Sequence, residues 1–240
     1  MNFIKQNINK ILLVIIYIVV FFGLSELIHN LLYNYVTENN QEILGTVIIN
    51  VALYLIMLVS GIILLKSELV YDIKKLNNTN AMKVFYICLA GIGAAYLGNY
   101  IGSIMSMTFG GAGNSANQDG VETMIFSPYG VIMVIVTVII GPIVEELVFR
   151  KSIHGICRNL KCPTWLMIII SSLLFGLIHV INAGDFVYVF PYIFMGVALG
   201  GIEIISKNIY PAIIVHMFIN AMSVSMLMFL KPLEEIMPMM

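Results

Sequence analysis

The stretch GPIVEELVFR (141–150) sets two adjacent glutamates and an arginine at the end of the apolar run VIMVIVTVIIGPIV (131–144). Such a run is typical of a membrane-spanning helix, in whose centre an Asp, Lys or Arg costs about 2.5–3.5 kcal/mol. Each Leu, Ile, Val or Phe recovers only about 0.3–0.6 kcal/mol on the same scale. We therefore expect Glu145, Glu146 and Arg150 to meet one another or to carry out chemistry.

The composition predicts an all-α, polytopic helical membrane protein whose surroundings are membrane lipids. Of the 240 residues, 60% are hydrophobic and only 10% are charged, whereas a soluble domain carries about 25% charged residues. The net charge is −1, so no basic surface points to a nucleic-acid partner. Cys88, Cys157 and Cys162 form no C-x-x-C pair, and we expect free thiols. No feature of the sequence fixes an oligomeric state.

About seven apolar segments have the length of about 17–25 residues that a membrane span needs, and an eighth span would follow if one of them is broken or re-entrant. We place them at 9–30, 43–65, 83–108, 129–157, 164–181, 186–206 and 209–230. The chain then divides into N-terminal helices with a polar loop (1–128), a C-terminal core (129–230) and a short tail (231–240). The loop GGAGNSANQDGVETMIFSP (110–128) is rich in Gly and Asn and is expected to be irregular.

The basic residues give the chain an orientation. With seven spans, eleven of the twelve Lys and Arg residues fall on one side of the membrane, or ten if Arg150 is buried, and only Lys231 falls on the other. The positive-inside rule makes the first side cytoplasmic. We therefore expect a multi-pass protein with a cytoplasmic N-terminus, and the short chain with few loops suggests a bacterial cell membrane.

Small residues in the third segment predict close helix packing. Gly98 and Gly102 have the G-x-x-x-G spacing that lets two membrane helices approach closely. Packing inside the monomer is the favoured interpretation, and a dimer face is the alternative.

Two histidines and an asparagine also lie within predicted spans. His216 and Asn220 are four residues apart, so both side chains can point into one cavity, and Phe175 and His179 share a helix face in the same way. The same spacing predicts an ion pair between Glu146 and Arg150. Glu145 is rotated by about 100° from Glu146 and should face a different neighbour.

Helix geometry also predicts the depths of these residues. Glu145 should lie about 18 Å above the cytoplasmic end of its helix, His179 about 22 Å and His216 only about 9 Å. The predicted depths of Glu145 and His179 thus match, whereas His216 is predicted to lie one or two helix turns lower. Other ionisable residues are expected to reach water and receive no role: Glu26, His29, His154 and Glu203.

These side chains suit peptide hydrolysis without a covalent intermediate. A carboxylate beside a neutral imidazole can activate a water as general base. A second histidine with an asparagine offers donors to the oxyanion that forms on the attacked carbonyl. Neither G-x-S-x-G nor H-E-x-x-H occurs in the sequence.

The ordered set of motifs resembles the CPBP family, the CAAX proteases and bacteriocin-processing (Abi) membrane proteases. The likeness covers about 142–220, whereas 1–128 match only in being hydrophobic. The motifs are E-E-x-x-x-R (Glu145, Glu146, Arg150), F-x-x-x-H (Phe175, His179) and H-x-x-x-N (His216, Asn220).

The resemblance implies a role for each matching position. Glu145 would activate water together with His179, and His216 with Asn220 would stabilise the oxyanion. Glu146, Arg150 and Phe175 would support the site. The resemblance leaves a metal open, because Glu145, His179 and His216 could form a two-histidine, one-carboxylate zinc set. A metal-independent glutamate-type protease with no required cofactor is preferred.

The function expected from the resemblance is an intramembrane endopeptidase that acts on a peptide or protein substrate at the membrane. Peptide maturation or bacteriocin self-immunity is favoured over the processing of prenylated CAAX proteins. One alternative is a non-catalytic membrane scaffold or immunity protein. A proton-coupled transporter ranks last, because no paired repeats or matched broken helices are visible.

Overall fold

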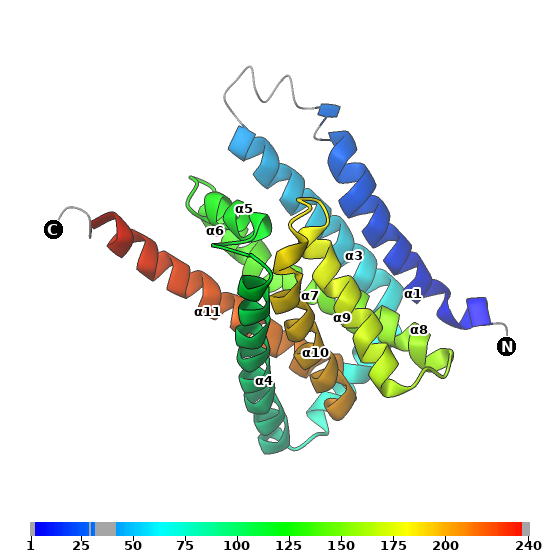
Figure 1. Ribbon diagram of the computed structural model, residues 1–240. Helices are drawn as coiled ribbons and strands as arrows, with labels where there is room; N and C mark the ends of the chain where they lie inside the picture. The colour runs from blue at the N-terminus through cyan, green and yellow to red at the C-terminus, as the bar shows by residue number, and fades with distance from the viewer. Residues whose placement is uncertain (1–2, 29, 32–41, 237–240) are drawn as a thin grey trace.

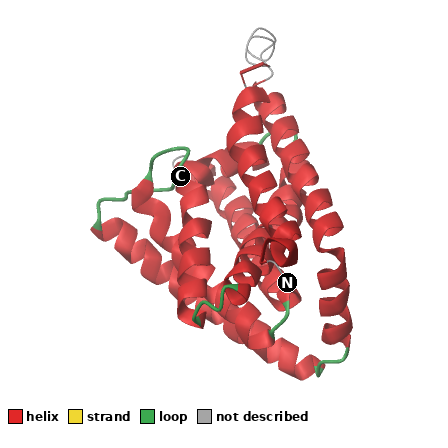
Figure 2. Ribbon diagram, turned by 90° about the vertical axis from the view of Figure 1, so that its right-hand side faces the viewer, coloured by secondary structure: helices red, strands yellow, loops and turns green. Residues whose placement is uncertain are grey.

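The structure, a computed structural model of the chain, describes residues 3–28, 30–31 and 42–236. Within these ranges every regular element is a helix (Figures 1 and 2), which confirms the predicted all-α class. Six of the helices are long and apolar enough to cross a membrane. His29 and the last four residues of the predicted tail lie outside the described residues.

The helices follow one another with short connections. The first is continuous from Phe3 to Ile28 and contains α1 (Phe3–Ile18) and the π-helical η1 (Val19–Leu24). It is followed by α3 (Glu42–Asn77), α4 (Ala81–Thr108) and the short α5 (Ala116–Ile125). The central helix comprises α6 (Gly130–Ile135), the π-helical η2 (Val136–Ile140), α7 (Gly141–Glu146), the π-helical η3 (Leu147–Ile153) and α8 (His154–Asn159). The C-terminal part comprises α9 (Thr164–Val180), the 3-10 turn η4 (Phe186–Tyr188), α10 (Val189–Ser206) and α11 (Ile209–Ile236).

Each of the seven predicted segments coincides with a helix. Six of these are the long candidate spans, and the fifth segment is α9, an apolar helix of 17 residues. The largest difference concerns α3, which has 36 residues and runs to Asn77, well beyond the predicted end at 65. Its extra turns are charged, and ion pairs hold them to the fold: Lys10 Nζ lies 2.5 Å from Glu68 and Lys151 Nζ lies 2.6 Å from Asp72.

The loop 110–128 is less irregular than we predicted, because it contains α5. Ser115 caps this helix by accepting a hydrogen bond from the backbone N–H of Gln118 at 3.2 Å. Gly110 and Gly113, both with positive φ, lie in the irregular backbone before α5, and residues 126–128 after α5 form turns and a bend. A side-chain cap outweighs the low helix propensity of Gly and Asn here.

The glycines of α4 pack inside the monomer, as predicted. A Cβ at Gly102 would lie 2.5 Å from the backbone N of Pro191, and a Cβ at Gly98 would lie 3.1 Å from Cβ of Phe194. Helix α10 therefore approaches the backbone of α4 as closely as only a glycine permits.

Ionic contacts between helices bring basic side chains together at one end of the bundle, where the N-terminus and α8 lie (Figure 1). Lys75 Nζ donates to the carbonyl of Lys207 at 2.7 Å, and Arg158 lies 2.5 Å from Glu203. Lys231 instead pairs with Glu122 of α5, at the opposite end. We call the end near the N-terminus and α8 the Lys-rich end, and the opposite end, near α5, the α5 end.

Two residues that we expected to reach water are buried. His154 is fully buried and Glu203 is 4% exposed. Their side chains share a hydrogen bond of 3.0 Å from His154 Nδ1 to Glu203 Oε2, which joins α8 to α10. Burial is tolerated because the carboxylate also meets Arg158. Glu26 is exposed, as expected.

Candidate functional site

The two glutamates of the E-E-x-x-x-R motif close the short helix α7, which has a π-helical segment on each side. A π-helical segment inserts an extra residue into a helical turn, and such segments are frequent at functional sites. Glu145 is 7% exposed and Glu146 is fully buried. Two carboxylates are thus held side by side in the interior of a membrane-type bundle.

Both glutamates contact the same imidazole. Nδ1 of His216 lies 2.9 Å from Oε1 of Glu146, and its Nε2 lies 3.6 Å from Oε2 of Glu145. The rotation between the two glutamates therefore sends them to the two nitrogens of one ring, whereas we expected different neighbours. A proton on Nδ1 donates to Glu146, and the other nitrogen is left facing Glu145.

Arg150 holds Glu146 in this position, as the i, i+4 spacing predicted. Its Nη1 donates to Oε1 of Glu146 at 2.9 Å, and its Nη2 donates to the carbonyl of Gly196 on α10 at 3.2 Å. The guanidinium is fully buried and its carbon lies 4.5 Å from the ring centre of Phe175. The ion pair, a backbone carbonyl and an aromatic face together compensate a charge without water.

Phe175 lies at the centre of the cluster and contacts both histidines. Its ring centre is 4.9 Å from that of His179 and 5.8 Å from that of His216. Nδ1 of His179 donates to the carbonyl of Phe175 at 2.8 Å, so the neutral ring carries its proton there and offers Nε2 as an acceptor. Glu145 interacts electrostatically with His179.

Asn220 makes its hydrogen bond outside the cluster of Glu145, Glu146 and His216. Its Nδ2 donates at 2.9 Å to the carbonyl of Thr137 in η2. Within the described part of the chain, no hydrogen bond joins Asn220 to His216, with which we expected it to share a cavity. The π-helical turn changes the hydrogen-bonding register at Thr137, and Asn220 supplies a partner to its carbonyl.

The predicted depth mismatch of His216 does not occur. His216 reaches the level of Glu145 although it lies close to the start of its helix, since its Nε2 is 3.6 Å from Oε2 of Glu145. Helix α11 runs obliquely to the other helices (Figure 1), whereas the predicted depths assumed parallel helices that begin at one level.

Three tyrosines around Glu145 escaped the sequence analysis. Tyr17 of α1, Tyr54 of α3 and Tyr192 of α10 all lie close enough to Glu145 for its charge to act on their phenols. The ring of Tyr192 also stacks on His179, with centres 4.3 Å apart and planes 16° apart. The only signal for them in the sequence was a tyrosine inside an apolar segment, and tyrosines are common in membrane helices.

The proposed zinc ligands do not form a three-ligand group as arranged here. Nδ1 of His216 already lies against Glu146, and its Nε2 faces Glu145. Across the described ranges, no three His, Cys, Asp or Glu side chains are grouped so as to hold a metal ion. We therefore derive no chemical step through a metal.

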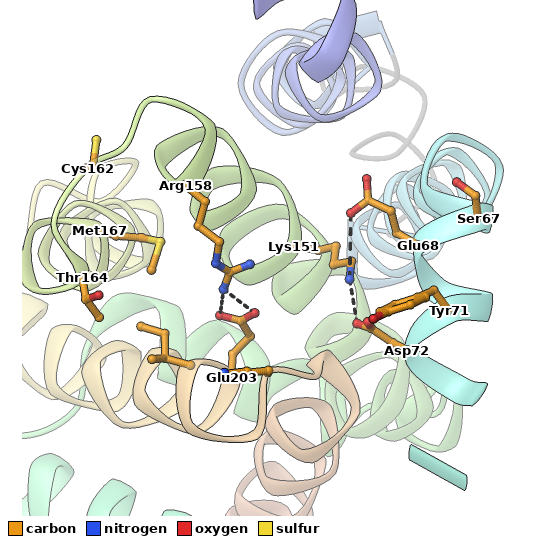
Figure 3. A pocket seen from close by; sticks show the side chains of 12 residues that line it. Ser67, Glu68, Tyr71, Asp72, Lys151, Arg158, Cys162, Thr164, Met167 and Glu203 are labelled. Atoms are coloured by element: carbon orange, nitrogen blue, oxygen red, sulfur yellow. Dashed lines mark hydrogen bonds and ion pairs between the residues drawn. The ribbon is translucent and has the colours of Figure 1, made fainter. Parts of the chain in front are cut away.

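A separate cavity of about 660 Å³ opens at the Lys-rich end. Figure 3 shows Lys151 between Glu68 and Asp72 on one side of it, and Arg158 against Glu203 on the other. These ion pairs join α3, η3, α8 and α10 at this end of the bundle.

Comparison with known protein families matches residues 127–222 to the type II CAAX prenyl endopeptidase Rce1-like family. The chain is 32% identical over 146 residues to the putative membrane peptidase YdiL of Bacillus subtilis, an alignment that covers 61% of this chain and 54% of the relative. It is 30% identical over 118 residues to the membrane-embedded CAAX protease MroQ of Staphylococcus aureus, with 49% of this chain and 47% of that protein covered.

A probable CAAX prenyl protease 2 of Schizosaccharomyces pombe is 29% identical over 101 residues, which cover 35% of this chain and 37% of the relative. The chain thus spans about half the length, or less, of these curated relatives. No solved structure matches the chain. The matched region holds all three motifs, and over residues 127–222 the chain resembles the Rce1-like CAAX prenyl endopeptidase (CPBP) family of membrane proteases.

Proposed function

We propose that the chain is an intramembrane endopeptidase that hydrolyses a peptide bond with a water activated by Glu145 and His179. The observation that carries the proposal is the meeting of the three family motifs in one buried cluster. Glu145 and Glu146 contact the two nitrogens of His216, and Phe175 lies between both imidazoles. The match of residues 127–222 to the Rce1-like family supports the reaction class.

The proposed reaction needs one base and one oxyanion donor. Glu145 takes a proton from water while the water oxygen attacks the scissile carbonyl carbon, and His179 orients that water through Nε2. The developing oxyanion accepts a hydrogen bond from a protonated Nε2 of His216, whose positive charge Glu146 offsets. The C–N bond then breaks, and the leaving amine takes the proton from Glu145.

Asn220 contributes to this proposal less directly. One N–H of its amide is engaged by Thr137. The second N–H is the donor that would reach an oxyanion beside His216.

We also propose that the reaction is metal-independent. Among the described residues, no three His, Cys, Asp or Glu side chains are grouped so as to hold a metal ion, which supports this. Cleavage of a peptide by the purified protein should persist after dialysis against a zinc chelator, and elemental analysis should find less than one zinc per chain. Loss of cleavage on chelation, restored by added zinc, would contradict this proposal.

The proposed substrate is a peptide or protein at the membrane, and the proposed role is peptide maturation or bacteriocin self-immunity. The names of the Bacillus subtilis and Staphylococcus aureus relatives support a bacterial membrane peptidase. A strain that carries the wild-type chain should be more resistant to a bacteriocin, or release more of a mature peptide, than a strain that carries Glu145→Gln. Protection that survives Glu145→Gln would instead favour a non-catalytic immunity protein.

The direct test of the proposed activity is cleavage of a hydrophobic peptide by the purified protein in detergent. Glu145→Gln keeps the shape of the side chain but removes the base, so kcat should fall by about 10²–10⁴-fold. The control is Glu26→Gln, which changes an exposed carboxylate in the first helix and should leave kcat unchanged. Size-exclusion profiles and melting temperatures should match for all three proteins. Full activity of folded Glu145→Gln would exclude Glu145 as the base.

A further inference from the structure

A small polar cavity lies between α4 and α10 at the α5 end, next to the candidate site. Its volume is about 200 Å³. Polar side chains from three parts of the chain line it: Asn99, Ser103, Ser106, Gln118, Tyr188 and Tyr192. All of these side chains are neutral, so the cavity suits neither a cation nor an anion.

Helix α4 turns a polar stripe toward this cavity. Asn99, Ser103 and Ser106 follow one another at spacings of four and three residues, which place them on one helix face. The close approach of α10 at Gly102 brings the wall formed by Pro191 and Tyr192 against the same face. Three polar residues on one face of an otherwise apolar helix are costly unless that face meets polar groups.

Ser106 supplies the observation that points to an occupant. It is 3% exposed, and among the residues that the structure describes its hydroxyl has no hydrogen-bond partner. A buried hydroxyl without a partner is unfavourable by about 1–3 kcal/mol, and a water removes that cost. At about 30 Å³ for each water, the cavity has room for roughly six.

Tyr192 separates this cavity from the candidate site. Its hydroxyl lies 2.9 Å from Oγ of Ser115 and accepts a hydrogen bond from Nδ2 of Asn117 at 3.3 Å. The ring of the same residue stacks on His179. The ring of Tyr192 thus contacts the candidate site, while its hydroxyl contacts polar side chains at the start of α5.

The segment that covers the cavity is held by a few polar contacts. The hydroxyl of Tyr188 donates to the carbonyl of Ala112 at 2.7 Å and accepts from its N–H at 3.1 Å. The backbone N–H of Ala116 donates to Asp185 at 2.8 Å. These bonds fix the start of α5 over the outer ends of α9 and α10.

We propose that this cavity is a hydrated chamber from which water reaches the Glu145–His179 pair past the ring of Tyr192. The link to hydrolysis rests on the proposed protease function, whereas hydration of the chamber does not. Ser106 and the α4 stripe hold the water, and Tyr192 is a positioning residue that controls its passage to His179.

Hydration is tested without any protease assay by the accessibility of introduced thiols. Ser106→Cys places a thiol in the cavity, whereas Ala95→Cys places one on the same helix in an apolar cluster where Ala95 is 2% exposed. Only a hydrated thiol forms the thiolate that reacts with a charged methanethiosulfonate, so Ser106→Cys should react at least about tenfold faster than Ala95→Cys. The wild-type chain gives the background of the native cysteines. Equal, negligible rates with both the sulfonatoethyl and the smaller aminoethyl reagent would overturn the proposal.

The role in hydrolysis is tested by filling the chamber. Ser106→Leu should lower kcat by about tenfold while KM stays unchanged, because water supply limits the chemical step and not substrate binding. Thr108→Leu, at an exposed position of the same helix, is the control and should leave both constants unchanged. A raised KM with unchanged kcat would overturn the proposal and make the cavity a substrate subsite. If no variant, wild type included, cleaves any peptide, the protease proposal fails while the labelling result still decides whether the chamber is hydrated.

Discussion

At the scale of single residues, the site contains a small network in which few side chains compensate the buried charges. One oxygen of Glu146 accepts hydrogen bonds from both Arg150 and His216, each at 2.9 Å. Within the described ranges, the other oxygen of Glu146 and Nε of Arg150 have no hydrogen-bond partner. Such a network is sensitive to the loss of any one member, because the remaining charge would stay buried and unpaired.

Glu146→Gln should therefore destabilise the fold strongly. It leaves the fully buried Arg150 without its counter-charge, and breaking a buried ion pair costs about 3–5 kcal/mol. The melting temperature in detergent measures this loss. Glu122→Gln, which breaks the more exposed pair with Lys231, should cost at most about 1 kcal/mol. Equal shifts for the two variants would contradict the buried network.

At the scale of secondary-structure elements, the π-helical segments and the α4–α10 contact set the positions of the catalytic candidates. Segments η2 and η3 flank α7, and Asn220 of α11 binds the carbonyl of Thr137 in η2. The contact of α4 with α10 places Tyr192 between α5 and His179. Both the π-helical segments and the α4–α10 contact position these side chains through the geometry of the backbone.

Asn220→Ala should disturb η2 because it leaves the Thr137 carbonyl without its side-chain donor. The expected cost is about 0.5–1.5 kcal/mol, the net contribution of a typical hydrogen bond, because this bond is part-buried, together with a fall in kcat. Ser225→Ala on the same helix removes only a hydroxyl that donates to Ala221 at an exposed position and should be close to neutral. Unfolding experiments and peptide cleavage measure the two effects, and a neutral Asn220→Ala would remove its role at η2.

The α4–α10 contact is tested by a pair of glycine substitutions. Gly102→Ala would drive a Cβ into the backbone of Pro191, and such overpacking costs about 1–3 kcal/mol or more. Gly93→Ala on the same helix meets nothing within 4 Å and should stabilise the chain by about 0.5–1 kcal/mol. Thermal unfolding separates the two, and a tolerated Gly102→Ala would show that the helices can move apart.

At the scale of the whole molecule, the two ends of the bundle differ in chemistry. The Lys-rich end is held by ion pairs around Glu68, Asp72 and Glu203, whereas neutral polar groups surround the chamber at the α5 end. By the positive-inside rule we propose that the Lys-rich end is cytoplasmic. The chamber would then open on the outer side of the membrane.

This orientation predicts which loops an impermeant reagent reaches in intact cells. Asn182→Cys, in the exposed loop between α9 and η4, should react with a bulky maleimide before lysis. Asn78→Cys, in the exposed loop between α3 and α4, should react only after lysis. The opposite pattern would mean that the chamber faces the cytoplasm.

The sequence alone determined the membrane class, the approximate positions of the apolar helices and some of the relations within a single helix. The i, i+4 spacing correctly predicted the Glu146–Arg150 pair, and the glycine spacing predicted the close packing of α4, because both depend only on regular helical geometry. It also supplied the ordered motifs from which the family could be inferred.

Only the tertiary structure decided how the helices meet. The position of α11 in the bundle brought His216 to both glutamates, and the π-helical turn directed Asn220 to Thr137. The packing of α10 against α4 placed Tyr192 between a polar cavity and His179. Tilts and contacts between distant segments follow from the packing of all side chains together, which no local spacing encodes.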